Sequence, residues 1–171
     1  MRTSLAAQEI LAHGRIAVTG VSRTPKGHGS NVVYRRLRDR GYDAVAINPI
    51  AEIVEGDRCY PSLRSVPGAV GAVVIGTSPA RAADTVRECI DLGVRYVWMH
   101  RGLGAGSVSP EAAVLAREHG LLVIEGGCPC MFGVTSDPFH RFVRLLQTAR
   151  GSLPRDVIDA AQEGTGLEPL V

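Results

Sequence analysis

The sequence predicts an α/β fold built on a five-stranded, mainly parallel β-sheet. Short apolar runs that are typical of strands alternate with longer stretches of helical periodicity. This alternation implies a parallel sheet with right-handed crossovers. Residues 70–75 are apolar throughout, as in strands that are covered on both faces. The 171 residues contain no internal repeat and fit one domain.

The expected strands are the apolar runs that end at glycine or polar turns. They lie at residues 16–21, 44–47, 70–75, 96–99 and 121–124. Helices are expected after Ser78-Pro79 and Asp137-Pro138, which suit a cap and a first turn, and to end at glycines such as Gly41 and Gly93. The expected helices cover residues 4–13, 30–40, 78–92, 109–119 and the segment that begins at 138.

Two segments carry weaker patterns. Residues 56–67 are too rich in proline for a full helix, so we expect a short extended piece and one helical turn there. Residues 1–150 are expected to form the domain, with an N-terminal and a C-terminal helix. Residues 151–171 form a C-terminal tail, which we expect to pack loosely or to serve a partner.

The composition excludes several classes of partner. A net charge of +2 is too small to indicate nucleic acid or a membrane surface. No apolar run approaches the roughly 20 residues of a membrane span, and the first residues lack the apolar core of a signal peptide. We therefore expect a cytoplasmic protein whose four cysteines are mostly thiols.

Residues 15–31 have the organisation of a phosphate site: a strand, a loop of small and basic residues, and then a helix. Glycines let the backbone approach an anion, and the first N–H groups and the dipole of the helix favour negative charge. Arg23 and Lys26 add full charges, while His28 either contacts phosphate or faces solvent. The alternative is a plain surface loop. The loop residues are Gly20, Ser22, Arg23, Lys26, Gly27, His28, Gly29, Ser30 and Asn31.

The end of the second expected strand argues against NAD. Dinucleotide enzymes usually place Asp or Glu there to accept hydrogen bonds from a ribose hydroxyl, and this chain has Asn48. In such sheets the ligand lies beyond the carboxyl ends of the strands, where the strand order switches. The loops expected to combine there are 20–31, 48–63, 76–79, 99–106 and 125–130.

These features resemble the CoA-binding domain family, a small Rossmann-like module. The module occurs alone in bacterial proteins and as the nucleotide-binding part of succinyl-CoA synthetase alpha chains. The resemblance covers roughly residues 5–130. The pieces that carry it are Gly20-Val21-Ser22, Pro25, Ser30, Gly41-Tyr42, Asn48-Pro49, Gly56, Tyr60-Pro61-Ser62-Leu63, Pro67, Gly93 and Trp98.

The resemblance implies a Rossmann-like three-layer fold and a ligand of the CoA type. The first loop would hold the phosphates, and Asn48-Pro49 with the stretch 60–63 would border the adenine-ribose end. CoA carries a pyrophosphate and a ribose 3′-phosphate, so Arg23 and Lys26 suit it better than NAD. The complete set of expected binding residues is Gly20, Ser22, Arg23, Pro25, Lys26, Gly27, His28, Ser30, Asn31, Asn48, Pro49, Tyr60, Ser62, Thr77, Pro79, His100 and Gly102.

We expect a non-catalytic sensor or carrier that binds CoA or an acyl-CoA. No catalytic residue is carried over, because the reaction of succinyl-CoA synthetase uses a histidine from a second domain. One alternative is an NAD(P)-dependent oxidoreductase, since Arg23 and Lys26 leave NADP open. Another is a subunit that contributes a nucleotide site to an acyl-CoA ligase complex. A homodimer is compatible with each of these functions.

Cys128 and Cys130 follow the last expected strand and admit three interpretations. They are small apolar residues under the last helix, or a thiol that exchanges with the CoA sulfhydryl, or metal ligands completed by Cys59 or a histidine. Cys-x-Cys is not the usual zinc spacing, and no second cysteine pair follows. We therefore expect core residues and no metal site.

Overall fold

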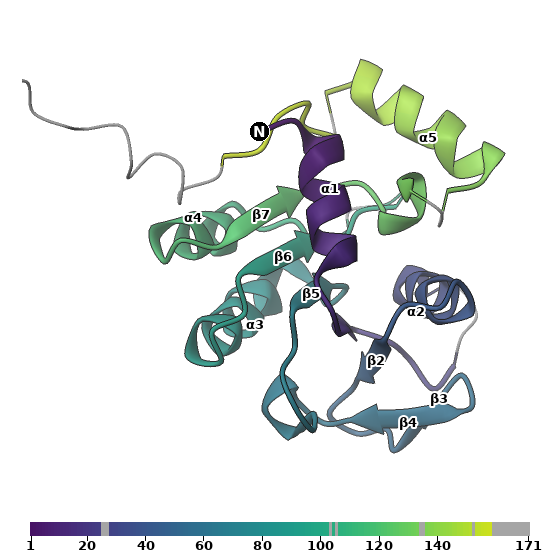
Figure 1. Ribbon diagram of the computed structural model, residues 1–171, viewed down its shortest axis with the longest axis vertical. Coiled ribbons are helices and arrows are strands. Elements are labelled where there is room, and N and C mark those ends of the chain that lie inside the picture. The colour runs from purple at the N-terminus through teal and green to yellow at the C-terminus, as the bar shows by residue number, and fades with distance from the viewer. Residues whose placement is uncertain (25–27, 103, 105, 134–135, 152, 159–171) are drawn as a thin grey trace, which may run out of the picture.

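The computed structural model describes residues 1–24, 28–102, 104, 106–133, 136–151 and 153–158. Within them, one sheet has the strand order β3-β4-β2-β1-β5-β6-β7 (Figure 1). Its pairings are parallel, except that β3 and β4 are antiparallel. The strands are β1 (Ile16–Thr19), β2 (Ala44–Ile47), β3 (Ile53–Val54), β4 (Asp57–Tyr60), β5 (Ala72–Ile75), β6 (Tyr96–Met99) and β7 (Leu122–Glu125).

Helices cover both faces of the sheet, with α1 and α2 on one side and α3 and α4 on the other (Figure 1). Two short 3-10 turns, η1 and η2, follow β4 and β7, and α5 comes last. The helices and turns are α1 (Thr3–Ala12), α2 (Gly29–Asp39), η1 (Leu63–Ser65), α3 (Pro79–Asp91), α4 (Pro110–Glu118), η2 (Pro129–Met131) and α5 (Pro138–Ala149). The predicted helices and the five predicted strands match these boundaries within two residues.

The prediction of five strands is wrong, because the described sheet has seven. The two additional strands form the β3–β4 hairpin, and β4 extends the sheet by pairing in parallel with β2. Glu55 and Gly56 connect the hairpin with φ angles of 53° and 84°, as a type I′ turn requires. Glutamate is unusual in that position, so the sequence gives little sign of this turn. The predicted extended piece and helical turn correspond to β4 and η1.

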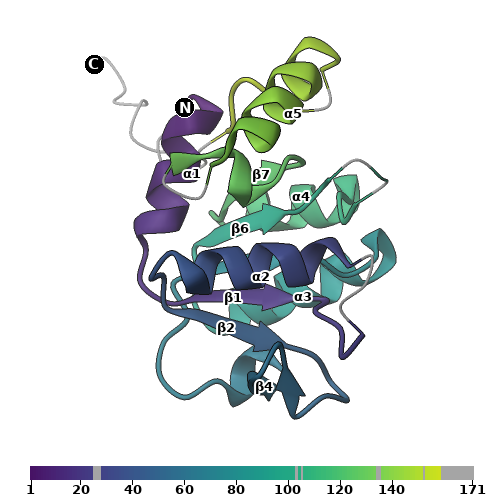
Figure 2. The same cartoon turned by 90° about the vertical axis from the view of Figure 1, so that its right-hand side faces the viewer.

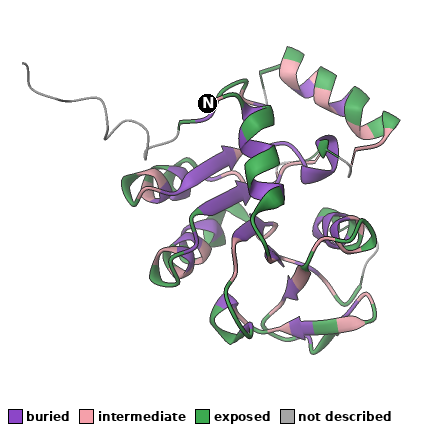
Figure 3. Ribbon diagram, viewed as in Figure 1, coloured by how far each residue is buried: buried purple, intermediate pink, exposed green. Residues whose placement is uncertain are grey.

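The central strands alternate between two apolar cores. Ile16 and Val18 of β1 face the core under α1 and α2, whereas Ala17 faces the core under α3 and α4. In the same way Trp98 lies in the first core and Val97 in the second. Figure 3 shows these strands as buried and the helices as buried only on their inner faces. Burial on both faces explains the continuous apolar runs in the sequence.

The part of the predicted tail that the structure describes is paired with the N-terminus. The N–H of Val157 donates to the carbonyl of Met1 at 2.8 Å, and the N–H of Thr3 donates to the carbonyl of Arg155 at 2.9 Å. Leu153 and Val157 are buried in the core that also holds α1. The chain after Gly151 therefore begins as an anchored segment and not as a loosely packed one.

No helix in the described ranges has the length and apolar character that would let it cross a lipid bilayer. The longest, α3, has 13 residues.

The loops after β1 and β5 touch through their backbones. Gly20 has a φ of 73°, and a Cβ built on it would lie 2.4 Å from the carbonyl carbon of Gly76. A Cβ on Gly76 would in turn lie 1.9 Å from Oγ of Ser30. The N–H of Gly76 donates to Oγ1 of Thr19 at 3.2 Å. Only glycine at both positions allows this approach.

The side chain of Asn31 fixes the loop after β1 to the start of α2. Its Oδ1 accepts from the N–H of Ser22 at 2.8 Å, and its Nδ2 donates to the carbonyl of Ser22 at 2.8 Å. Nδ2 also donates to Oε1 of Glu55 in the β3–β4 turn at 2.8 Å. Asn31 is fully buried, so these bonds replace all contact of its amide with water.

We predict that Gly20→Ala destabilises the fold much more than Gly41→Ala. Both glycines have positive φ, but a Cβ at Gly41 meets nothing within 4 Å. Backbone strain alone costs about 1 kcal/mol at Gly41, and the clash with Gly76 adds about 1–3 kcal/mol at Gly20. Urea unfolding followed by fluorescence of the buried Trp98 measures both. Equal losses would contradict the close approach of the two loops.

We also predict that Asn31→Ala lowers the free energy of unfolding by about 2–3 kcal/mol. The substitution leaves the partly buried N–H and carbonyl of Ser22 without their Asn31 partners, and an unpaired buried group costs about 1–3 kcal/mol. The control is Gln8→Ala on the exposed face of α1, which should change stability by at most about 0.5 kcal/mol. A loss of that small size for Asn31→Ala would show that the loop is held in another way.

Candidate functional site

The candidate site is a cleft at the switch in strand order. From β1 the chain crosses through α2 to β2, and from β5 it crosses through α3 to β6 on the other side of β1. The loops after β1 and β5 therefore diverge at the carboxyl edge of the sheet, and both lead into helix N-termini. Figure 2 shows β1, β2 and β6 pointing toward this common edge. Ligands of open α/β sheets bind at such a point.

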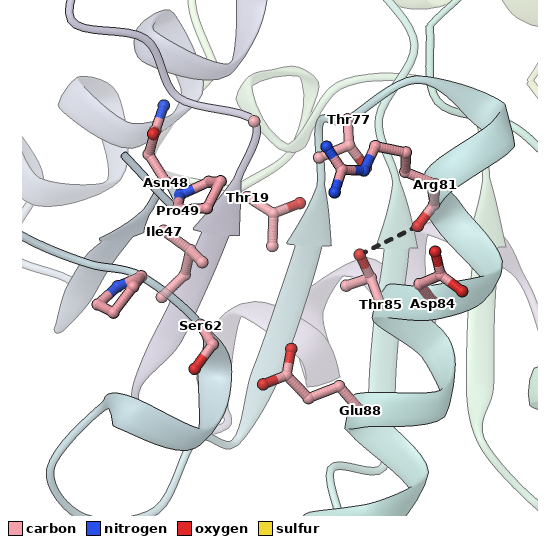
Figure 4. Close-up of a pocket in the computed structure, with 12 residues that line it drawn as sticks. Thr19, Ile47, Asn48, Pro49, Ser62, Thr77, Arg81, Asp84, Thr85 and Glu88 are labelled. Atoms are coloured by element: carbon pink, nitrogen blue, oxygen red, sulfur yellow. Dashed lines mark hydrogen bonds between the residues drawn. The ribbon is translucent and has the colours of Figure 1, made fainter. Parts of the chain in front are cut away.

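The cleft has a volume of about 210 Å³ and takes its walls from four segments (Figure 4). This volume is below the roughly 300–1,000 Å³ of pockets that enclose a whole drug-sized ligand, so the cleft suits part of a larger molecule. Five of its residues were expected: Gly20, Asn48, Pro49, Ser62 and Thr77. Pro61 belongs to the stretch 60–63 that was expected to border the ligand, and six lining residues were not expected: Thr19, Ile47, Arg81, Asp84, Thr85 and Glu88.

Thr77 carries the strongest local sign of a ligand. Its Oγ1 is buried and has no hydrogen-bond partner within the described part of the chain. Buried hydroxyls in native proteins are nearly always paired, so this one is free to bond to a molecule in the cleft. Thr77 also lies directly before α3, where the dipole and the first N–H groups of the helix favour an anion.

Arg81 adds a positive charge beside Thr77. It occupies the first turn of α3, and its guanidinium extends toward Thr77 in Figure 4. The first turn of α3 contains no acidic residue, and the Ser78 side chain makes no capping hydrogen bond. Arg81 was not among the binding residues expected from the sequence, because the loop before it contains little glycine. The sequence does carry one sign of this site: an arginine occupies the first turn of the helix, where an acidic residue would be stabilising.

The opposite end of the cleft is acidic. Glu88 lies away from the Arg81 guanidinium (Figure 4) and accepts the N–H of Arg64 at 3.0 Å through Oε1. Asp84 lies closer to Arg81 and pairs with Arg87 at 2.9 Å. The cleft therefore has an anion-attracting end near Arg81 and a hydrogen-bond-accepting end near Glu88. A ligand with a phosphate at one end and hydroxyl or amino groups at the other fits this distribution.

Asn48 lines the cleft, but its side chain is engaged within the protein. Nδ2 donates to the carbonyl of Val21 at 2.6 Å, and Oδ1 accepts the N–H of Ile50 at 2.9 Å. Asn48 thereby joins the loops after β1 and β2. Its backbone N–H donates to the carbonyl of Tyr60 at 2.9 Å, which brings the predicted 48–49 and 60–63 segments together. Ser62 caps η1 in a reciprocal bond with Ser65.

The loop after β1 is described only in part. Arg23 and His28 are exposed, and His28 precedes the first turn of α2. Ser22 accepts the N–H of Thr24 at 3.1 Å, and Ser30 donates to the carbonyl of Gly76 at 3.3 Å. The predicted binding residues Pro25, Lys26 and Gly27 lie outside the described residues.

His100 and Gly102 lie one strand away from the cleft, beyond β6. The ring of His100 packs against Gly29, where an added Cβ would lie 3.0 Å from its Cε1. Burial, together with the charge of His140, lowers the pKa of His100 to about 4. Its imidazole is therefore neutral at neutral pH and offers hydrogen bonds without charge. The carbonyl of Gly102 accepts Nε2 of Gln147 from α5 at 2.8 Å.

Pro79 occupies the first position of α3 and is exposed. Tyr60 is half-buried at the end of β4, with the Arg58 guanidinium 5.2 Å from its ring centre. Neither residue lines the cleft, although their neighbours Ser78-Thr77 and Pro61-Ser62 lead into it. The structure thus brings the predicted loops 48–63 and 76–79 together with Gly20 of the loop 20–31 at one site. It leaves His100 and Gly102 beside that site.

Comparison with known proteins agrees with this geometry. Among solved structures, the chain is similar to a hypothetical protein from Pyrococcus horikoshii OT3, with 30% identity and a TM-score of 0.67 over 74% of this chain and 87% of that one. It is also 28% identical over 122 residues to the uncharacterized protein YneT of Bacillus subtilis (strain 168), covering 71% of this chain and 87% of YneT.

A third relative is part of a ligase. The chain is 28% identical over 119 residues to the acetate–CoA ligase (ADP-forming) II subunit alpha of Pyrococcus furiosus. The match covers 66% of this chain but only 26% of that subunit. Residues 14–133 match the family model described as CoA binding domain, and this range runs from β1 through η2 and includes the whole cleft. The chain therefore belongs to the CoA-binding domain family.

Proposed function

We propose that this protein binds CoA or an acyl-CoA in the switch-point cleft and acts as a non-catalytic sensor or carrier. The observation that carries the proposal is the Thr77 hydroxyl, which has no hydrogen-bond partner among the described residues and lies beside Arg81 at the start of α3. Together they offer a hydroxyl, a guanidinium and helix N–H groups to one phosphate. Membership of the CoA-binding domain family gives that phosphate its chemical context.

The cleft accommodates the nucleotide end of CoA. Its phosphates would lie near Arg81 and the N-terminus of α2, and its adenosine between Asn48-Pro49 and Ser62. The predicted contact of Lys26 with a phosphate stays a prediction. The pantetheine arm would run outside the cleft, because the volume of about 210 Å³ holds only a fraction of CoA.

Two features support a binding role without catalysis. The carboxylates of Asp84 and Glu88 already pair with Arg87 and with a backbone N–H. Oγ1 of Thr19, which lines the cleft, accepts the N–H of Gly76. The described lining therefore offers no nucleophile held by a neighbouring base, which is the arrangement that acyl transfer requires.

A second candidate is the nucleotide-binding part of an acyl-CoA ligase complex, which the similarity to the P. furiosus ligase subunit favours. In that case the protein should co-purify with a second chain from its own cells. The two chains together should form acyl-CoA from a carboxylic acid, CoA and a nucleoside triphosphate, and neither chain should do so alone.

We predict that CoA and acetyl-CoA stabilise the protein, whereas NAD and NADP do not. A ligand at 100 times its dissociation constant adds about 2.7 kcal/mol, which raises the melting temperature by about 5–10 °C for a chain of this length. Differential scanning fluorimetry with CoA, dephospho-CoA, acetyl-CoA, NAD, NADP and ATP tests this. Stabilisation by NAD or NADP alone would favour an oxidoreductase instead.

We further predict opposite effects of Thr77→Val on binding and on stability. The substitution keeps the shape of the side chain and removes an unpaired buried hydroxyl, so the ligand-free protein should be equally or more stable. The dissociation constant for CoA should rise about five- to tenfold, as for the loss of one hydrogen bond. Calorimetric titration and urea unfolding measure the two effects.

Arg81→Gln should weaken CoA binding about 10- to 100-fold, because it removes a charge-assisted hydrogen bond worth about 1.5–3 kcal/mol. The matched control is Arg150→Gln, an exposed arginine at the end of α5, which should leave the affinity unchanged. Unchanged affinity in both Arg81→Gln and Thr77→Val would place the ligand elsewhere.

A further inference from the structure

Two cysteines and a histidine meet beyond the carboxyl end of β7. Cys128 precedes η2, Cys130 lies within it, and His140 lies in the first turn of α5. One ligand atom from each of these three side chains lies within 4.8 Å of the other two. We call these residues the Cys-His cluster. Both cysteines are buried, as the core interpretation expected, but that interpretation does not account for the histidine.

The ring of His140 is oriented by a carboxylate. Its Nδ1 lies 2.9 Å from both side-chain oxygens of Asp137. Asp137 also accepts the backbone N–H of His140 at 2.8 Å and forms an ion pair with Arg36 of α2. These contacts hold the pKa of Asp137 well below its usual range. An ionised carboxylate at Nδ1 keeps the proton there and leaves Nε2 as a lone-pair donor, which is the arrangement around histidines that bind metal.

The two thiols also interact with each other through a hydrogen bond. The thiol of Cys128 donates to the sulfur of Cys130, which raises the pKa of Cys128 and lowers the pKa of Cys130. The positive charge of Arg36 acts in the same direction on Cys130. The two sulfur atoms therefore lie close to each other and to the side chain of His140.

We propose that Cys128, Cys130 and His140 bind one zinc ion. Two thiolates and an imidazole nitrogen are preferred zinc ligands, at about 2.3 Å and 2.0–2.1 Å from the metal. Ligands at such distances in a tetrahedron lie roughly 3.5–3.8 Å apart, so the cluster needs to contract by at most about 1 Å. Within the described residues the cluster has three members, and a water molecule would complete the tetrahedron.

The proposed site differs from the expectation of no metal, because the tertiary structure brings a histidine to the two cysteines. Cys59, which was considered as a further ligand, lies in β4 near the other edge of the sheet. The other alternative, a histidine, fits the geometry: His140 lies beside the two cysteines and is ten residues beyond Cys130 in the sequence. A bound zinc ion would join η2 to α5, and through Asp137 and Arg36 it would also join α5 to α2.

The test is metal content and cobalt spectroscopy of the whole protein. After purification with a reductant and removal of metal by a chelator, the protein should bind one equivalent of Zn²⁺ by mass spectrometry of the native protein. Co²⁺ in its place should give thiolate-to-metal charge transfer in the near ultraviolet and the strong visible bands of a tetrahedral site. Zn²⁺ should also raise the melting temperature, and EDTA should reverse the rise.

Variants separate ligands from neighbours. Cys128→Ser, Cys130→Ser and His140→Gln should each abolish the cobalt charge-transfer spectrum or weaken Zn²⁺ binding by more than about 100-fold, since each removes one of three ligands. Asp137→Asn, which changes only the partner of the ligand, should weaken it about 10- to 100-fold. The control is Cys89→Ala, a buried cysteine on α3 in the other core, which should bind zinc as the unchanged protein does.

The proposal fails if the reduced protein binds no stoichiometric Zn²⁺, or if the three ligand variants bind it as well as the control. A mass loss of two hydrogens in air, without metal uptake by the reduced form, would instead identify the two cysteines as a disulfide-forming pair. Circular dichroism checks that each variant is folded. If a cysteine variant does not fold, Asp137→Asn still tests the site, because it leaves the three ligands in place. The readout does not involve CoA, so failure here leaves the proposed function standing.

Discussion

The backbone contact between Gly20 and Gly76 is the constraint on which the candidate site depends. It holds together the two loops that diverge at the switch in strand order, and it orients the N-termini of α2 and α3 toward the same edge of the sheet. Any side chain at these positions would push the loops apart. From the sequence we expected glycine at position 20 to allow the approach of an anion. In the structure this glycine is needed for the close approach of the loop after β5.

Buried polar side chains then fix the loops around this contact. Asn31 joins the β1 loop to α2 and to the β3–β4 turn, and Asn48 joins it to the loop after β2. The same hairpin is tied to α2 by Asp57, which accepts from Tyr34 and pairs with Arg38. Asn31 and Asn48, which were predicted as ligand contacts, thus bond within the protein, whereas the proposed ligand contacts are Thr77, which was also predicted, and Arg81, which was not.

The centre of the sheet and its β7 edge differ in chemistry. The centre carries a cleft with helix N-termini and a guanidinium, suited to phosphate. The β7 edge carries thiols and an oriented imidazole, suited to a thiophilic metal. The neutral ring of His100 lies between them, packed on the start of α2 and influenced by the charge of His140. Metal binding would therefore act on α2 through Asp137 and Arg36, and nucleotide binding would act at the N-terminus of α2.

The sequence by itself determined the alternation of strands and helices, because strands buried on both faces and helix caps each produce a recognisable local pattern of residues. It also determined which loops lie at the carboxyl edge. It indicated an extended piece at β4 but did not reveal β3 or the place of the hairpin in the sheet, since the turn uses Glu55 and β4 pairs with β2, which is separated from it in the sequence. Tertiary structure alone decided that Arg81 shares a cleft with Asn48 and Ser62 from distant loops, and that His140 meets Cys128 and Cys130 where α5 packs against η2. Both depend on how elements pack against one another, which local residue patterns do not encode.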